Sequence, residues 1–154
     1  MTKGAIIEPT APRMLPAITD ANRALYTGGA QGQLLIQRCD ACGRWAPQPA
    51  DRCEACGGAL TPAAVSGDGT VFTFTVNMHQ FHPDVAPPNV IAIVVLAEQE
   101  DLRLPTNIVG VEHGALHIGL PVQVLFEHHG DVYYPVFEPI AGSGALAPRG
   151  EGAG

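Results

Sequence analysis

The sequence predicts a mainly β protein in which a short N-terminal helix and a four-cysteine ribbon precede a small barrel of five or six strands. Glycine and proline supply 18 and 14 of the 154 residues, about a fifth against a usual background of about 12%, which favours short strands joined by turns over a helical bundle. All four cysteines lie between residues 39 and 56. From residue 65 onward, apolar runs of strand length alternate with turn residues, as in small barrels.

We expect four segments along the chain. Residues 1–33 form an N-terminal arm and a short helix, residues 34–62 the ribbon and residues 63–140 the barrel. Residues 141–154, AGSGALAPRGEGAG, form a flexible tail because they hold too few large apolar side chains to pack.

Within the first segment, Pro9, Pro12 and Pro16 and a lack of periodicity predict an extended arm from residue 1 to about residue 15. Thr19 and Asp20 offer an N-cap, and apolar residues then recur at helical spacing until Gly28 and Gly29. These signals predict a short helix from about residue 17 to residue 27.

The cysteines form two pairs that suit one metal ion. Two residues separate the members of a pair, so one tight turn presents both sulfurs, and two such turns complete a tetrahedron. Each pair is followed by glycine, which adopts the positive φ that lets backbone N–H groups point at the sulfurs. In a reducing compartment such a cluster is more typical of a metal site than of disulfides. The four candidate ligands are Cys39, Cys42, Cys53 and Cys56.

The spacing favours Zn²⁺ in a rubredoxin-like zinc ribbon, which a strand over residues 34–37 enters. Iron in rubredoxin-like centres uses the same four ligands, so spacing alone leaves iron open. Four protein ligands close the coordination sphere and leave no position for a reacting water. We therefore expect a structural Zn²⁺.

Three of the chain's eight cationic residues, Arg38, Arg44 and Arg52, lie beside these ligands. Four thiolates and one Zn²⁺ carry a net negative charge, which these arginines are placed to offset. An alternative role is contact with a phosphate, such as that of coenzyme A, because the guanidinium fork matches phosphate oxygens.

The barrel segment contains runs that predict strands. In residues 70–76, Val71, Thr73 and Thr75 alternate with Phe72, Phe74 and Val76. Residues 90–96 are apolar without interruption, which is consistent with a strand buried on both faces. Closing such strands into a barrel removes exposed edges. The expected strands are residues 70–76, 90–96, 102–109, 115–118, 122–127 and 132–137.

Charge and hydropathy exclude several classes. The formal net charge is −7, with 8 basic and 15 acidic residues, and a nucleic-acid partner would require more positive charge. No run of 18 apolar residues occurs, so we expect no membrane span. The apolar stretch Ala5–Ile7 is too short for a signal peptide. We therefore expect a cytoplasmic protein.

The sequences of three segments resemble those of the acyl-CoA-associated zinc-ribbon/OB-fold family, first described as a domain of unknown function. Residues 32–60 (GQLLIQRCDACGRWAPQPADRCEACGGAL) resemble its ribbon, and residues 66–77 (SGDGTVFTFTVN) its first barrel strand. Residues 102–139 (LRLPTNIVGVEHGALHIGLPVQVLFEHHGDVYYPVFEP) are similar to its later strands. The resemblance covers about residues 16–139 and implies an OB-fold barrel.

The resemblance implies a non-catalytic accessory subunit of a thiolase-like, lipid-transfer-protein-type aldolase, which cleaves a hydroxyacyl-CoA by a retro-aldol reaction. The TNIV and PVFEP motifs are most similar to those of members attached to MaoC-like enoyl-CoA hydratases of steroid side-chain degradation. No hydratase-like sequence precedes the ribbon in these residues, so we expect any such hydratase to be a separate subunit. Two copies of each subunit are expected. Another branch of the family serves thiolases acting on aromatic acyl-CoA compounds such as benzoylsuccinyl-CoA.

The residues themselves also point to chemistry elsewhere. With all cysteines on the metal, no thiol remains as a nucleophile, and Ser66 and Ser143 stand in a turn and in the tail. His79 and His82 could form a second metal site with Asp84, which would make a metalloenzyme, or belong to an exposed apolar docking loop. We expect the remaining histidines to lie at the surface; they are His113, His117, His128 and His129.

The aromatic residues Trp45, Tyr133 and Tyr134 raise a further alternative, because aromatics on OB-type barrels stack bases of single-stranded nucleic acid. Residues 104–148 contain no Lys or Arg, so we expect these aromatics to pack in the core or against a partner protein. Thr106 and Asn107 interrupt an apolar strand, and we expect a structural role for both.

Overall fold

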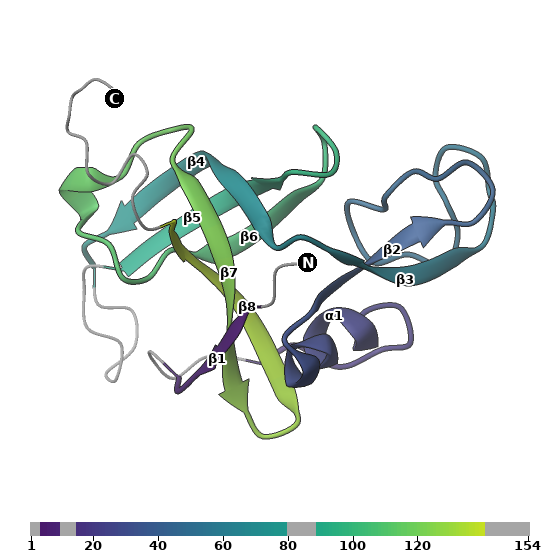
Figure 1. Cartoon of the computed structure of the whole chain (residues 1–154), viewed down its shortest axis with the longest axis horizontal. Helices are drawn as coiled ribbons and strands as arrows, with labels where there is room; N and C mark the ends of the chain where they lie inside the picture. Colours follow the sequence, from purple (N-terminus) through teal and green to yellow (C-terminus); the bar gives the residue numbers. More distant parts are fainter. Residues whose placement is uncertain (1–3, 10–14, 80–88, 141–154) are drawn as a thin grey trace.

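The structure is a computed structural model that describes residues 4–9, 15–79 and 89–140, and it is mainly β, as predicted (Figure 1). A six-stranded sheet forms the barrel and a two-stranded sheet carries the ribbon. The elements in chain order are β1 (Ala5–Ile7), α1 (Arg23–Thr27), the 3₁₀ turn η1 (Gly28–Gln31), β2 (Leu34–Cys39), β3 (Leu60–Val65), β4 (Asp68–Asn77), β5 (Asn89–Leu96), β6 (Arg103–Asn107), the 3₁₀ turn η2 (His113–Ala115), β7 (Pro121–His129) and β8 (Val132–Pro139).

The pairing among strands β4 to β8 is antiparallel, and the sheet closes on itself. β4 pairs with β5, β5 with β6, β7 with β8, and β4 with the start of β7. The gap between β6 and β8 is bridged by Ile108, which pairs with Phe137, and by the backbone N–H of Val109, which donates to Phe137 O across 2.8 Å. Closure therefore leaves few unpaired backbone groups on these short strands.

Thr106 and Asn107 strengthen this closure, so the structural role predicted for them is confirmed. Thr106 is only 5% exposed, and its hydroxyl donates to Pro135 O on β8 across 3.1 Å. The side-chain amide of Asn107 donates to Val90 O on β5 across 2.9 Å. Both polar side chains thus join β6 to its neighbours.

β4 does not follow the simple alternation expected for residues 70–76. The register with β5 shifts between Val71 and Thr73, so Phe72 is an extra residue in a bulge and points outward with 42% of its surface exposed. The inward set is therefore Val71, Phe74 and Val76, which pack in the core. A bulge of this kind bends a strand as a small barrel requires.

β5 corrects a second expectation, because it is not buried on both faces. Its burial alternates along the strand: Val94 is fully buried, whereas Ile91 is 48% exposed. The inward row fills the barrel, and the outward row is also apolar. The sequence of such a strand looks the same as that of a strand buried on both faces, so hydrophobicity alone does not distinguish the two.

The N-terminal segment differs from the expected arm and helix. Ala5–Ile7 forms β1, which pairs in parallel with β7. A run of three residues is too short to show the alternation of apolar and polar residues that predicts a strand. The helix is restricted to Arg23–Thr27, and Gly28 and Gly29 continue into η1. Before the helix, Thr19 and Asn22 each accept, through the side chain, a hydrogen bond from the backbone N–H of the other, across 3.2 and 2.7 Å. This reciprocal exchange resembles a capping box, and Thr19 is one of the two residues predicted to cap the helix.

The strand expected at residues 115–118 is absent from the structure, which has η2 and an irregular turn there. The next strand, β7, begins only at Pro121. Before it, the N–H of Gly119 donates to Val71 O and the carbonyl of Leu120 accepts from Val71 N. The tail expected over residues 141–154 and most of residues 10–15 lie outside the described residues.

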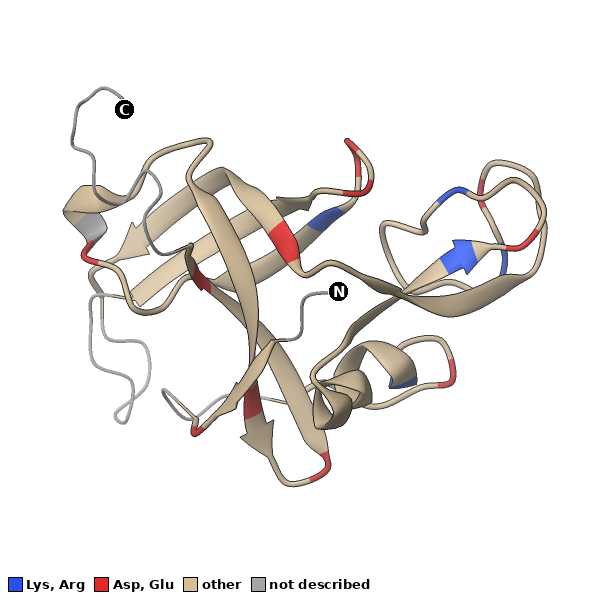
Figure 2. Ribbon diagram, in the orientation of Figure 1, with Lys and Arg blue, Asp and Glu red and all other residues tan. Residues whose placement is uncertain are grey.

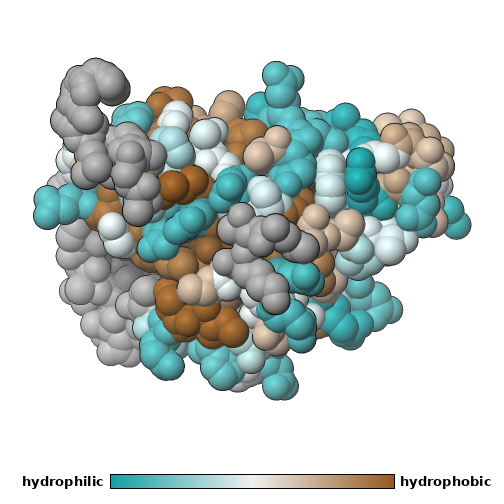
Figure 3. All heavy atoms as spheres, in the orientation of Figure 1, coloured by the Kyte–Doolittle hydropathy of each residue, from teal (hydrophilic) through white to brown (hydrophobic). Residues whose placement is uncertain are grey.

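The barrel interior contains the main hydrophobic core. Its largest fully buried side chains include Phe126, Phe137 and Leu120, each contributing roughly 1.5–3 kcal/mol by burial. On the face drawn in Figure 3, the most hydrophobic residues gather over the barrel rather than over the ribbon. Among the described helices, none has the length and apolar content that crossing a bilayer demands.

Replacing Thr106 by valine tests barrel closure, because the change keeps the shape of the side chain and removes the bond to Pro135 O. We expect Thr106→Val to lower the free energy of unfolding by about 1 kcal/mol, measured by urea denaturation. Thr75→Val, at an exposed position of β4, is the control and should change stability by less than about 0.5 kcal/mol. Equal effects of the two changes would contradict a closing role for Thr106.

Candidate metal centre

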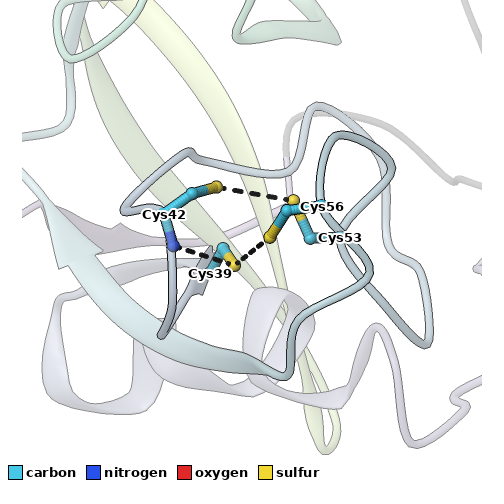
Figure 4. A group of neighbouring side chains, drawn as sticks. All are labelled: Cys39, Cys42, Cys53 and Cys56. Atoms are coloured by element: carbon cyan, nitrogen blue, oxygen red, sulfur yellow. Dashed lines mark hydrogen bonds between the residues drawn. The ribbon is translucent and has the colours of Figure 1, made fainter.

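The structure brings the four predicted cysteines together at the end of the ribbon. Their sulfurs all lie within 4.8 Å of one another, and Figure 4 shows them turned toward a common centre. Cys39 Sγ and Cys56 Sγ are 3.5 Å apart, and Cys42 Sγ and Cys53 Sγ are 3.7 Å apart. Each close contact thus joins the two turns rather than the members of one turn.

Each turn has the backbone geometry that its glycine was predicted to supply. Gly43 and Gly57 have φ of 77° and 78°, a conformation that costs L-residues roughly 1–2 kcal/mol. Their N–H groups donate to the carbonyls of Cys39 and Cys53 across 3.0 and 2.8 Å. This closure of the turn leaves the N–H of Cys42 free to approach Cys39 Sγ, at 3.4 Å.

The two turns are copies of one another. Both carry the pattern Arg-Cys-acid-Ala-Cys-Gly, as RCDACG at residue 38 and RCEACG at residue 52. The two arginines make matching bonds: Arg38 donates to Gly43 O across 2.8 Å, and Arg52 to Gly57 O across 3.2 Å. This short repeat is the signal by which sequence reasoning could have assigned both arginines to the turns.

The pKa values of the thiols show how crowded the cluster is. The N–H of Cys42 is the main reason that the pKa of Cys39 falls to about 6, and the N–H of Cys56 lowers the pKa of Cys53. At Cys56 the N–H of Gly58 acts in the same direction, but the neighbouring sulfurs, Cys39 first, outweigh it and raise the pKa to about 12. Four thiolates this close repel one another, so the last keeps its proton until a cation balances the charge.

The cluster fits a tetrahedral metal ion. With metal–sulfur distances of about 2.3 Å, the edges of the tetrahedron are about 3.8 Å, close to the two sulfur–sulfur distances above. Gly58 keeps this space open, since a Cβ on Gly58 would lie 2.9 Å from Cys39 Sγ and 3.3 Å from Cys56 Sγ. Four thiolates leave no protein position for a reacting ligand, so the site suits a structural metal.

The arginines beside the ligands contact the chain itself. Besides its bond to Gly43, Arg38 lies over the ring of Trp45 at 4.9 Å, and Arg44 forms an ion pair with Asp101 of the barrel. These contacts favour the structural account of the arginines over the phosphate account. Arg44 and Arg52 also line a cavity of about 180 Å³ together with Trp45.

The ribbon is fixed to the barrel through the turn between β5 and β6. The Gln99 side chain accepts from Trp45 N and donates to Trp45 O, both across 2.9 Å. Glu98 accepts from Ser66 N across 2.8 Å at the passage from β3 to β4. Trp45, only 7% exposed, is therefore a core residue of this junction, which agrees with the expectation that it packs.

The histidines do not form a second metal centre in the described part of the chain. His79 is exposed, and the residues proposed to join it, His82 and Asp84, lie outside the described residues. His117 and His128 are exposed as expected, and His128 stacks on Tyr133 with ring centroids 4.7 Å apart. Of His113 only the backbone, in η2, is described.

His129 contradicts the expectation of a surface histidine. Its side chain is 12% exposed, and Nε2 lies 3.0 Å from Oε1 of Glu127, whose side chain is fully buried. The two residues are separated by one position on β7 and therefore point to the same face. Glu127 was missed because acidic side chains are buried only rarely, and only when paired.

Similar proteins share both the ribbon and the barrel. The family model "ChsH2, C-terminal OB-fold domain" matches residues 63–127. The solved structure "Ltp2-ChsH2(DUF35) aldolase" contains a chain that is 34% identical, with a TM-score of 0.73 over 81% of this chain and 98% of that chain. A DUF35-family structure of unknown function from Sulfolobus solfataricus, 17% identical, matches 79% of this chain and 86% of that chain with a TM-score of 0.57, and so shares the fold.

A curated relative from Thermomonospora curvata is described as "Probable enoyl-CoA hydratase alpha subunit". It is 35% identical over 134 residues, which are 86% of this chain and 41% of that protein. The chain thus spans about two fifths of the length of this relative.

Gly57 provides a test of the turn geometry, because a Cβ there would have open space around it and only the positive φ opposes a side chain. We expect Gly57→Ala to destabilise the ribbon by about 1 kcal/mol, seen as several-fold faster metal release to a chromogenic chelator. Gly114→Ala, also in open space but without positive φ, is the control. Unchanged release from Gly57→Ala would contradict the requirement for glycine.

Proposed function

Because this chain belongs to the DUF35 family of acyl-CoA-associated OB-fold proteins, we propose that it is a non-catalytic accessory subunit of a thiolase-like acyl-CoA aldolase. The observation that carries the proposal is the match to nearly the whole length of a chain in the Ltp2-ChsH2(DUF35) aldolase structure. The closed set of four cysteines supports it, since a metal so enclosed braces a scaffold and offers no site for a substrate.

The proposed reaction of the complex is retro-aldol cleavage of a hydroxyacyl-CoA, with a steroid side chain as the substrate class. This chain stabilises the aldolase subunit and shapes its active site, and all proton transfers belong to the partner. The assembly is proposed to contain two copies of each subunit, and a MaoC-like enoyl-CoA hydratase, the activity in the name of the T. curvata relative, supplies the hydroxyacyl-CoA.

The metal is proposed to be Zn²⁺ with a structural role. Zn²⁺ has no preferred geometry of its own and is commonly held by four thiolates in ribbons of this spacing. Bound zinc offsets the charge that raises the pKa of Cys56, and its binding releases protons from the thiols.

The nucleic-acid alternative is disfavoured by the barrel itself. Between residues 63 and 140 the sequence contains a single Lys or Arg, Arg103, among many acidic residues. A groove that follows a phosphate backbone requires several cations.

Elemental analysis tests the metal assignment. We expect one zinc per chain and no iron in protein produced in medium containing both metals, and Cys39→Ser with Cys56→Ser to lose the zinc and unfold the ribbon. Ser66→Ala, at a hydroxyl remote from the sulfurs, is the control for handling. A stoichiometric iron content, or an exchangeable water on the metal, would contradict a structural zinc.

Co-expression tests the accessory role. We expect the lipid-transfer-protein-type aldolase of the same organism to co-elute with this chain in equal amounts, and to cleave a steroid-side-chain β-hydroxyacyl-CoA only in that complex. Benzoylsuccinyl-CoA with a thiolase partner is the comparison for the aromatic branch of the family. An aldolase that is soluble and fully active without this chain would refute the accessory role, as would turnover of a thioester by this chain alone.

A further inference from the structure

In the sheet formed by β4, β5 and β6, the outward row of the central strand β5 is apolar, although a strand face open to water is ordinarily polar. On the central strand β5, the outward residues are Ile91, Ile93 and Val95, opposite a fully apolar inward row. Ile91 is 48% exposed and Ile93 and Val95 are half-buried. The described residues thus leave the outward row of β5 partly uncovered.

The register between the strands shows which residues surround this row. Three lines run across the sheet: Thr75, Ile91 and Asn107; Thr73, Ile93 and Pro105; and Thr70, Val95 and Arg103. The bulged Phe72 adds an exposed aromatic ring beside the third line. No carboxylate stands in any of the three lines.

Arg103 is the one charged residue of this face. It is the single Lys or Arg of residues 63–140, and Figure 2 shows the blue of β6 apart from the blue segments of the ribbon and α1. Its guanidinium lies over the ring of Phe72 at 4.1 Å. Among the described residues it has no hydrogen-bond acceptor and no ion pair. A guanidinium placed over a ring still has N–H donors available for a carboxylate.

We propose that this surface is where the aldolase subunit docks. We call it the β5 face and define it as Phe72, Ile91, Ile93, Val95 and Arg103. The partner presents an apolar patch to the isoleucines and valine and an Asp or Glu carboxylate to Arg103. The identity of the partner rests on the function proposed above, whereas the location of the surface rests on burial, register and charge.

The charge of the face selects this occupant over two others. A nucleic acid would need several cations along its backbone, and the face has one. A second copy of the chain, related by a two-fold axis, would bury two copies of Arg103 against lines that contain no carboxylate, and an unpaired buried charge is strongly unfavourable. A different protein that carries its own carboxylate satisfies Arg103.

The test measures the dissociation constant of the complex between the full chain and the aldolase subunit. We expect Ile91→Glu and Arg103→Leu each to weaken binding by about tenfold or more. Binding by the wild type should also weaken as salt rises, and Arg103→Leu should remove most of that dependence. The matched controls are Ile6→Glu, which changes a residue of β1 with the same 48% exposure, and Arg23→Leu, which removes an exposed arginine on α1; both should bind within about twofold of wild type.

Each other outcome overturns the proposal in a recognisable way. Tight binding by all variants would place the interface elsewhere while leaving the accessory function intact. No binding by the wild type would refute the accessory function and remove the partner. A dimer of the isolated chain that Ile91→Glu dissociates would assign the face to a second copy. A large loss of stability in isolated Ile91→Glu, absent from Ile6→Glu, would show that the chain itself covers the face.

Discussion

The ribbon is organised around four thiol groups placed close enough together to bind one cation. Between residues 39 and 60 only Cys39, Trp45 and Cys53 are buried, so this segment has almost no hydrophobic core to offset its conformational entropy. The sulfurs lie within 4.8 Å of one another, where their mutual repulsion raises the pKa of Cys56. The proposed zinc turns this repulsion into an attraction that holds both turns together, and the two turns position the other contacts of the ribbon.

Those contacts make the ribbon and the barrel one scaffold. The two cysteine turns position Arg38, whose guanidinium lies over Trp45. The backbone N–H and carbonyl of Trp45 are both bonded by the side-chain amide of Gln99. Gln99 belongs to the turn between β5 and β6, so the orientation of the ribbon is coupled to two of the three strands that bear the β5 face. A rigid body of this kind suits a subunit whose proposed work is to shape a partner rather than to react.

The parts predicted from sequence are those in which local chemistry determines geometry. The spacing of Cys39 and Cys42 requires one tight turn, and Gly43 has the positive φ that such a turn needs. Sequence reasoning failed where distant pairing decides the outcome. Ala5–Ile7 is a strand only because β7 offers it an edge. His129 is mostly buried because its Nε2 finds a partner in Oε1 of the fully buried Glu127, 3.0 Å away on the same face of β7. The bulge at Phe72 likewise follows from barrel curvature, which no alternating pattern records.

β5 shows how a failed expectation carries functional information. Its uninterrupted apolar run predicts burial on both faces, and the described chain buries only the inward row. Nothing in the folding of a small barrel requires isoleucine on a solvent-facing position, where threonine gives comparable strand propensity. An apolar outward row costs solubility in the free chain, so its presence is explained when a second surface removes it from water. Arg103 then fixes the orientation of that surface, because an apolar contact alone has no preferred direction, whereas the guanidinium donates to a carboxylate from one edge only.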